Sequence, residues 1–154
     1  GVVSERKVGV VLMHRKGTPA DMQRGGGPVY EDVVGEICEF LLERVAFAVD
    51  CGVERKRVLI DPGIGFGKRV EDNVSLLRRL DRLVSLGCSV VVGASRKRFI
   101  GEITGVEQPR DRLGGSVACG IIAAMAGAAV IRVHDVAMTA HALAMVRAMD
   151  RRQA

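Results

Sequence analysis

Apolar runs alternate with amphipathic segments along the whole chain. Residues 8–13 form a continuous apolar run, which is typical of a strand buried in a parallel sheet. Residues 31–49 then place apolar side chains three or four positions apart, which predicts an amphipathic helix that ends at Cys51-Gly52. Its inward face is predicted to hold Val34, Ile37, Leu41, Leu42 and Val45. The same order recurs in predicted strands at 58–60, 89–92 and 129–133 and in predicted helices at 72–86, 111–125 and 136–149.

This regular alternation of strand and helix favours a parallel sheet with crossover helices, because no hairpin signal interrupts it. Two α/β architectures fit the pattern, a doubly wound sheet and part of a (β/α)8 barrel. A whole barrel needs about 250 residues. Four strand–helix units in 154 residues therefore amount to half of a barrel.

The composition is that of a globular chain, with 48% hydrophobic and 27% charged residues. The net charge of +5 suits an anionic partner, but it does not distinguish nucleic acid from a small phosphate. Aromatic residues make up only 3%, which argues against a protein that stacks single-stranded bases.

The cysteines and the apolar segments indicate the cellular compartment of the protein. The four cysteines lack CxxC spacing, so we predict buried free thiols in a reducing compartment. Residues 113–131 are uncharged over a length that could cross a membrane, but their glycines and alanines favour a helix followed by a buried strand. The first residues do not resemble a signal peptide. We therefore expect a soluble, cytoplasmic protein with no membrane contact.

Polar side chains follow each predicted strand at its carboxyl end. They are His14, Asp61, the group Ser95, Arg96 and Lys97, and the pair Arg132 and His134. Ligand sites of parallel α/β proteins lie at this end of the strands. We therefore expect these groups to meet at one mouth.

Residues 61–68 form a glycine-rich loop that begins with a carboxylate. The loop matches neither the GxxxxGK[ST] nor the GxGxxG phosphate-binding pattern. Asp61 could accept two N–H bonds from a planar heterocycle, and Phe66 could stack on its face. The alternative is that Asp61 only caps the turn before Pro62.

The cations predict an anion site in the same mouth. Lys97 is expected to enter it, while its basic neighbours face the surface or a carboxylate; a solvated charge run is the alternative. Arg132 and His134 are two apart on a predicted strand, so they share a face. A buried arginine needs a partner anion, and its guanidinium suits a phosphate. The histidine spacing does not predict a metal site.

Five motifs together resemble the dihydropteroate synthase family, in the family's order and over nearly the whole chain. They are residues 12–19 (LMHRKGTP) with Met22-Gln23, 61–68 (DPGIGFGK), 93–97 (GASRK), 112–116 (RLGGS) and 131–136 (IRVHDV). The resemblance implies a pterin-binding TIM barrel. It further implies condensation of 6-hydroxymethyl-7,8-dihydropterin diphosphate with 4-aminobenzoate to 7,8-dihydropteroate and diphosphate, with Mg²⁺ assisting.

The resemblance also implies roles for individual residues. Asp61 would bind the pterin ring, in a pocket lined by Met13, Phe66 and Gly93. Lys97 would contact the pterin and the aminobenzoate pocket, beside Ser95. Arg132 and His134 would hold the diphosphate. Catalysis would rest on Lys97 and Asp61.

The chain departs from the family in two ways. Arg15 and Arg98 replace an apolar and a small hydroxyl residue that the family more often has at these positions. Residues 1–154 also correspond only to the family's carboxyl-terminal half, without the part that ligates Mg²⁺. We therefore expect the isolated chain to be inactive, no metal ligand within it, and a homodimer in the full-length protein.

Two other functions remain open. A methyltetrahydrofolate-dependent corrinoid methyltransferase shares a pterin-binding barrel, although the cations favour a diphosphate. The second alternative is a non-catalytic half-domain that only binds a pterin or a partner. Nucleic-acid binding is disfavoured, because the cations are divided among strand ends rather than aligned along one helix.

Overall fold

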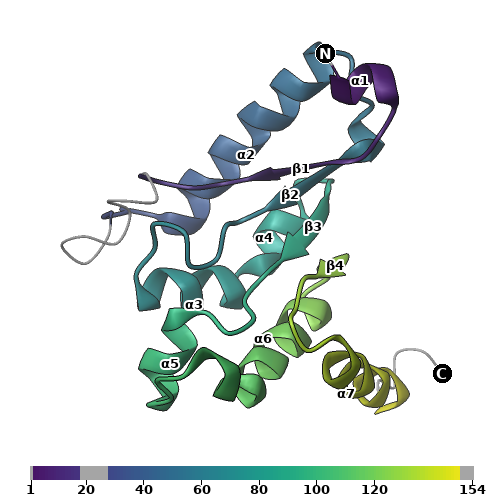
Figure 1. The fold of residues 1–154 in the computed structure, drawn as a ribbon. Helices are drawn as coiled ribbons and strands as arrows, with labels where there is room; N and C mark the ends of the chain where they lie inside the picture. Colours follow the sequence, from purple (N-terminus) through teal and green to yellow (C-terminus); the bar gives the residue numbers. More distant parts are fainter. Residues whose placement is uncertain (1, 18–27, 150–154) are drawn as a thin grey trace.

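The computed structural model describes residues 2–17 and 28–149, which form one parallel sheet covered by helices (Figure 1). Its elements are α1 (Val2–Arg6), β1 (Val10–Met13), α2 (Val33–Asp50), η2 (Arg55–Arg57), β2 (Val58–Asp61), α3 (Val70–Arg78), α4 (Leu80–Val84), β3 (Ser89–Val92), α5 (Arg98–Thr104), η3 (Pro109–Asp111), α6 (Leu113–Met125), β4 (Val130–Ile131) and α7 (Val136–Met149). The predicted alternation of strands and helices is confirmed.

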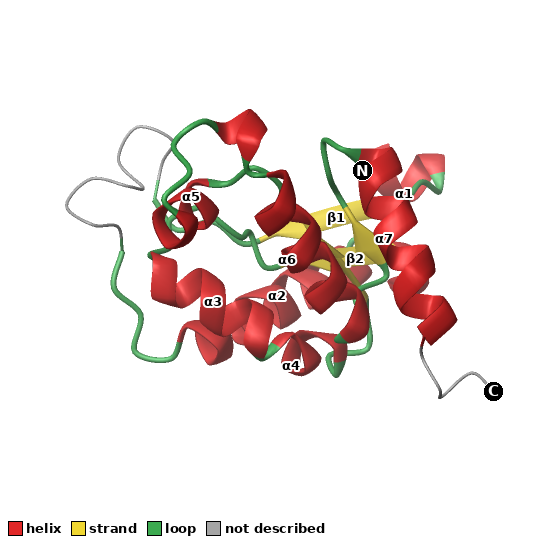
Figure 2. Ribbon diagram, turned by 90° about the horizontal axis from the view of Figure 1, so that it is seen from below, coloured by secondary structure: helices red, strands yellow, loops and turns green. Residues whose placement is uncertain are grey.

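The four strands lie side by side in chain order, β1-β2-β3-β4, and all neighbours are parallel. The helices follow the curve of the sheet in the same order: α2 contacts β1 and β2, α4 contacts β3, and α6 contacts β4. Figure 2 shows the arrangement from below, with α2, α3, α4 and α6 gathered beside the strands. Sequential parallel strands with the crossover helices between them form an arc of a (β/α)8 barrel.

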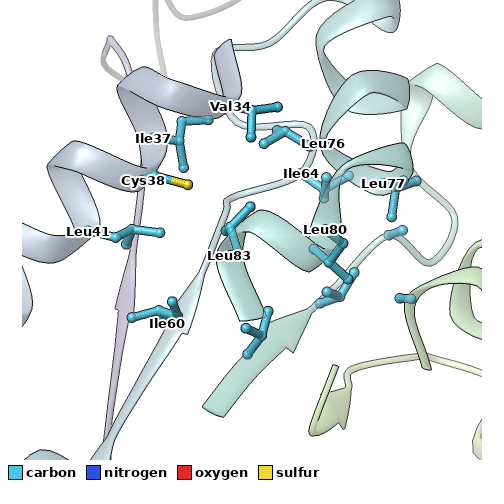
Figure 3. Packing of buried hydrophobic residues seen from close by; sticks show 14 of the residues in the cluster. Val34, Ile37, Cys38, Leu41, Ile60, Ile64, Leu76, Leu77, Leu80 and Leu83 are labelled. Atoms are coloured by element: carbon cyan, nitrogen blue, oxygen red, sulfur yellow. The ribbon is translucent and has the colours of Figure 1, made fainter. Parts of the chain in front are cut away.

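Alternate strand residues face the helices and form the core. Val58 and Ile60 of β2 and Val90 and Val92 of β3 are buried in one cluster with the apolar faces of α2, α3 and α4. Figure 3 shows Ile37 and Leu41 of α2 pointing toward the side chains of α3 and α4 across this layer. Because side chains alternate across a strand, the residues between them face the concave side. Asp61 is one of these.

The concave side of the sheet is only partly covered by the described residues. Val11 and Met13 of β1 and Val130 of β4 are exposed there, and β1 and β4 each have a strand partner on one side only within the described ranges. An open edge and an exposed apolar face favour association with more chain.

Several sequence predictions need correction. The strand predicted at 8–13 begins at Val10, after a short helix that the pattern did not indicate. The helix predicted at 72–86 is divided at Arg79, whose φ of −114° and ψ of 31° interrupt the helix. Leu77 before the break and Leu80 after it are both buried in the core.

Two predictions of burial are wrong as well. Leu42 was placed on the inward face of α2, but it is 42% exposed because Leu41 occupies the inward position. All four cysteines are free, as predicted, but only Cys38 is buried; Cys88 and Cys119 are partly exposed, and Cys51 at the end of α2 is exposed. No helix within the described ranges is long and apolar enough to span a membrane.

The two adjacent leucines of α2 provide a test of this packing. We expect Leu41→Ala to lower the free energy of unfolding by about 2–5 kcal/mol, since it opens a cavity in the core. Leu42→Ala should cost less than about 1 kcal/mol, because the side chain already contacts solvent. Urea unfolding measures both, and equal losses would contradict the observed orientation of α2.

Candidate functional site

A cavity of about 500 Å³ lies at the carboxyl ends of the strands. It is lined by Met13, Phe66, Gly93, Ser95, Lys97, Arg132, Val133 and His134. Every predicted site residue except Asp61 therefore lines one cavity, and Asp61 is hydrogen-bonded to Arg132 of its wall. The strand ends therefore converge as expected, except that His14, which was also expected at this mouth, does not line the cavity.

Asp61 lies beneath the cavity at the end of β2 and is only 1% exposed. Its Oδ1 accepts a 2.7 Å hydrogen bond from the backbone N–H of Gly63, so it does cap the turn after the strand. Its Oδ2 accepts a 2.9 Å hydrogen bond from Nη2 of Arg132. Asp61 is therefore more than a turn cap, because its second oxygen is joined to the wall of the cavity.

The loop at residues 61–68 packs directly against the chain that follows β1. Gly63 and Gly67 have φ of +69° and +61°, and a Cβ on either would collide with the backbone carbonyl of His14 or Lys16. Only glycine combines such dihedral angles with so close an approach. The Tyr30 hydroxyl also donates a 2.8 Å hydrogen bond to the Gly67 carbonyl. These contacts hold in place the loop from which Phe66 reaches the cavity.

Lys97 reaches into the cavity, as predicted. Its Nζ donates a hydrogen bond to the Ile64 carbonyl and lies 4.1 Å from the centre of the Phe66 ring. Burial lowers the pKa of Lys97 to about 8, an effect that Asp61 opposes and Arg132 reinforces. The side chain is thus a cation at neutral pH that can lose its proton in mild base.

The loop that carries Ser95 and Lys97 is held by Arg96, which has a φ of +60°. Its guanidinium binds Asp135 through Nε at 3.2 Å and Nη2 at 2.7 Å, and its backbone N–H donates to the Ser116 hydroxyl at 2.9 Å. The ion pair lowers the pKa of Asp135. A non-glycine residue at such a dihedral angle persists only where its surroundings impose it.

Arg98 does not enter the cavity. Its Nε lies 2.6 Å from Oε1 of Glu102 on the same helix, and its side chain is 65% exposed. The basic run is therefore divided as expected: Lys97 faces the site, and its neighbours meet carboxylates.

Arg132 and His134 need a correction, because β4 ends at Ile131 and neither lies on the strand. The Arg132 backbone N–H still donates to the Val92 carbonyl at 2.9 Å, which keeps this segment beside β3. The Arg132 side chain is 57% exposed rather than buried, although its Nη2 is held by Asp61. His134 Nδ1 lies 3.0 Å from the Ser95 hydroxyl, which orients the imidazole ring.

Two buried polar residues lie beside the site without lining the cavity: Lys68, which the sequence did not single out, and His14, which it placed at the mouth. Lys68 and His14 are 7% and 6% exposed, and Lys68 Nζ lies 3.1 Å from His14 Nδ1. The sequence alone does not indicate that a lysine at the end of a glycine-rich loop is buried. Within the described ranges no three histidine, cysteine, aspartate or glutamate residues are grouped so that they could hold a metal ion.

Three comparisons place the chain among known proteins. Residues 1–134 match the family described as pterin binding enzyme. The dihydropteroate synthase of Escherichia coli K12 is 43% identical over 145 residues, which cover 94% of this chain and 50% of that protein.

Solved structures agree. The dihydropteroate synthase of Xanthomonas albilineans with 4-aminobenzoic acid is 48% identical, with a TM-score of 0.88 over 97% of this chain and 52% of that one. The enzyme of Thermus thermophilus in complex with 6HMPPP is 44% identical, with a TM-score of 0.89 over 96% and 58%. The chain thus spans about half the length of the curated relatives it matches, and it belongs to the pterin binding enzyme family.

Proposed function

We propose that this chain forms the pterin diphosphate-binding half of a dihydropteroate synthase. The reaction would join 6-hydroxymethyl-7,8-dihydropterin diphosphate to 4-aminobenzoate and release 7,8-dihydropteroate and diphosphate. One observation carries the proposal: a buried carboxylate, an aromatic ring, a lysine and an arginine from three strand ends meet at one cavity. A Xanthomonas albilineans synthase that is 49% identical to the chain was solved in complex with 7,8-dihydropteroate, which supports this choice of product.

Asp61 and Phe66 form the side of the cavity suited to the heterocycle. A carboxylate has about four lone-pair directions, so Asp61 can accept ring N–H bonds in addition to the one from Gly63. Phe66 offers a flat apolar surface. Gly93 leaves room, because a Cβ there would lie 3.1 Å from the Arg132 guanidinium.

Arg132 and His134 form the side suited to the diphosphate. Arg132 is exposed enough for a phosphate oxygen to reach its guanidinium while Nη2 stays on Asp61, and Ser95 holds His134 beside it. As the bond between the methylene carbon and the diphosphate oxygen breaks, its electron pair goes to the diphosphate. Cations placed there in advance stabilise that developing charge, while Asp61 stabilises the positive charge left on the dihydropterin.

The attacking amine then forms the new bond. The nitrogen of 4-aminobenzoate adds to the same methylene carbon and releases one proton to solvent. Lys97 lies over Phe66 at the mouth, where its ammonium group can meet both the pterin and the anionic aminobenzoate. Positioning of the two substrates supplies the rest of the acceleration.

The residues around the cavity do not fit a protein-held Mg²⁺ ion. This ion prefers carboxylate and water oxygens, whereas the cavity wall presents Lys97 and Arg132. We therefore derive no step through a metal, and Mg²⁺ stays a prediction that concerns the complementary half of the enzyme. Residues 1–154 as the carboxyl-terminal half, a homodimer of the full-length protein and a cytoplasmic location likewise stay predictions.

The corrinoid methyltransferase remains the alternative enzyme. Its methyl donor carries no diphosphate, so it would leave Arg132, His134 and Lys97 without their anion. Competition between inorganic diphosphate and a dihydropterin for one site would favour the synthase, and dependence on a cobalamin protein would favour the methyltransferase.

The first prediction concerns the division of the enzyme. By calorimetry, the isolated chain should bind 6-hydroxymethyl-7,8-dihydropterin diphosphate without converting it. Addition of the complementary half of the Escherichia coli synthase should yield 7,8-dihydropteroate from 4-aminobenzoate, since the open edges of β1 and β4 would then be covered. Turnover by the chain alone would refute the need for a second half. Absence of any pterin binding would refute the proposed function.

The second prediction concerns the diphosphate. Arg132→Met should weaken binding of inorganic diphosphate by ~10- to 100-fold, because charge-assisted hydrogen bonds are lost and Asp61 is left without its partner. Arg98→Met removes the same charge from the exposed ion pair with Glu102, and its effect should stay within about twofold. Equal effects of the two substitutions would show that only net charge matters.

The third prediction concerns pH. Lys97 binds an anion only while protonated, so the affinity for diphosphate should fall as the pH rises through about 8, the lowered pKa of this lysine. Arg132 remains a cation throughout this range. In Lys97→Met the fall should vanish, and only the titration of diphosphate itself should remain. Calorimetry from mildly acidic to mildly basic pH measures both, and an unchanged profile in the variant would exclude Lys97 as the titrating group.

A further inference from the structure

Lys68 is a buried cation outside the cavity, on the far side of the loop at residues 61–68. Its Nζ donates a 3.1 Å hydrogen bond to the Phe66 carbonyl and lies 3.1 Å from Nδ1 of His14. A Cβ placed on Gly63 would lie 3.4 Å from the same nitrogen. The ammonium group thus lies against the turn in which the Gly63 N–H donates to Asp61.

The surroundings of Lys68 do not stabilise its charge fully. Among the described residues no carboxylate forms an ion pair with it, and burial lowers its pKa to about 7, an effect that Asp61 and Asp72 oppose and Lys97 reinforces. A buried lysine with a lowered pKa makes the fold less stable at neutral pH than an apolar side chain of similar length would. The two hydrogen bonds of Nζ, to Phe66 and His14, are therefore the contacts that offset its loss of hydration.

His14 is prepared to accept the hydrogen bond from Lys68. Burial lowers the pKa of His14 to about 4, with further lowering by Lys68 and Lys16 and an opposing effect of Glu36. The ring is therefore neutral at pH 7, and one nitrogen carries a lone pair. Its edge-on contact with Phe40, 4.9 Å between ring centres, fixes the plane of the imidazole.

We propose that Lys68 is a positioning residue for the pterin side of the site: by joining the His14 ring to the Phe66 carbonyl, it holds the loop that places Phe66 and Asp61. This role rests on the proposed function. It separates the two sides of the cavity, because Lys68 supports the residues for the heterocycle and contacts neither Arg132 nor His134.

Lys68→Met tests this role in the isolated chain, since methionine keeps the length and removes the donor. The affinity for 6-hydroxymethyl-7,8-dihydropterin diphosphate should fall about tenfold, the effect of one lost charge-assisted hydrogen bond. The affinity for inorganic diphosphate should stay unchanged. Urea unfolding should show that the variant still unfolds cooperatively, with a midpoint close to that of the wild type. Lys56→Met, at an exposed lysine paired with Glu54, is the matched control and should change neither affinity.

A spectroscopic measurement reports on the pair directly. In nitrogen-15 NMR of the imidazole rings, the pKa of His14 should rise in Lys68→Met, because the charge that lowers it is gone. His14→Phe should weaken pterin binding as Lys68→Met does, and the double variant should be no weaker than either single variant, since both remove one contact.

The outcomes are distinct. Loss of affinity for both ligands in equal measure, or a marked loss of stability, would make Lys68 a structural residue and overturn the proposal. Unchanged affinity for the pterin diphosphate would also overturn it and leave the proposed function intact. Failure of the wild type to bind the pterin diphosphate would overturn the proposed function, and the positioning role with it.

Discussion

The ion pair between Asp61 and Arg132 joins the two ends of the site across 71 positions of the chain. Asp61 ends β2, and Arg132 follows β4, so β3 lies between them. The pair can form only because the strands are parallel and adjacent in chain order, which brings all their carboxyl ends to one edge. Asp61 is almost fully buried, and a carboxylate in that position requires a nearby cation. The fold and the site therefore depend on the same contact.

The charges of the site are unevenly divided: among the described residues it holds several cations and one buried carboxylate. Arg132 contacts Asp61, and the charge of Asp61 opposes the lowering of the pKa of Lys97 and Lys68. Both lysines have a lowered pKa for the same physical reason, which is loss of hydration. A site with this balance attracts an anion, whose arrival would offset the mutual repulsion of the cations.

Periodicity and strand-end chemistry predicted much of this site from the sequence. Asp61, Lys97, Arg132 and His134 were expected at one mouth, and alternation of strands with helices suffices to predict that. Side-chain orientation was less predictable. The predicted inward face of α2 wrongly included Leu42 beside Leu41, because two adjacent leucines fit a helical period equally well.

Other features could not be predicted because they depend on distant parts of the chain. The burial of Lys68 results from the packing of its loop against residues 14–16, far away in sequence. The pairing of Arg96 with Asp135 likewise depends on the approach of the segment before α7 to the loop after β3. The sequence of a short polar segment does not indicate its distant partners, since long-range packing determines which charged residues come into contact.

The close approach of Gly63 and Gly67 to the carbonyls of His14 and Lys16 restricts how this part of the chain can diverge. One inserted or deleted residue within positions 14–16 would shift one carbonyl relative to its glycine, and no side-chain substitution elsewhere would restore both contacts. Changes in chain length between β1 and α2 are therefore compatible with this loop only beyond Lys16. The two glycines therefore fix how many residues separate the carbonyls of His14 and Lys16 in the segment opposite them.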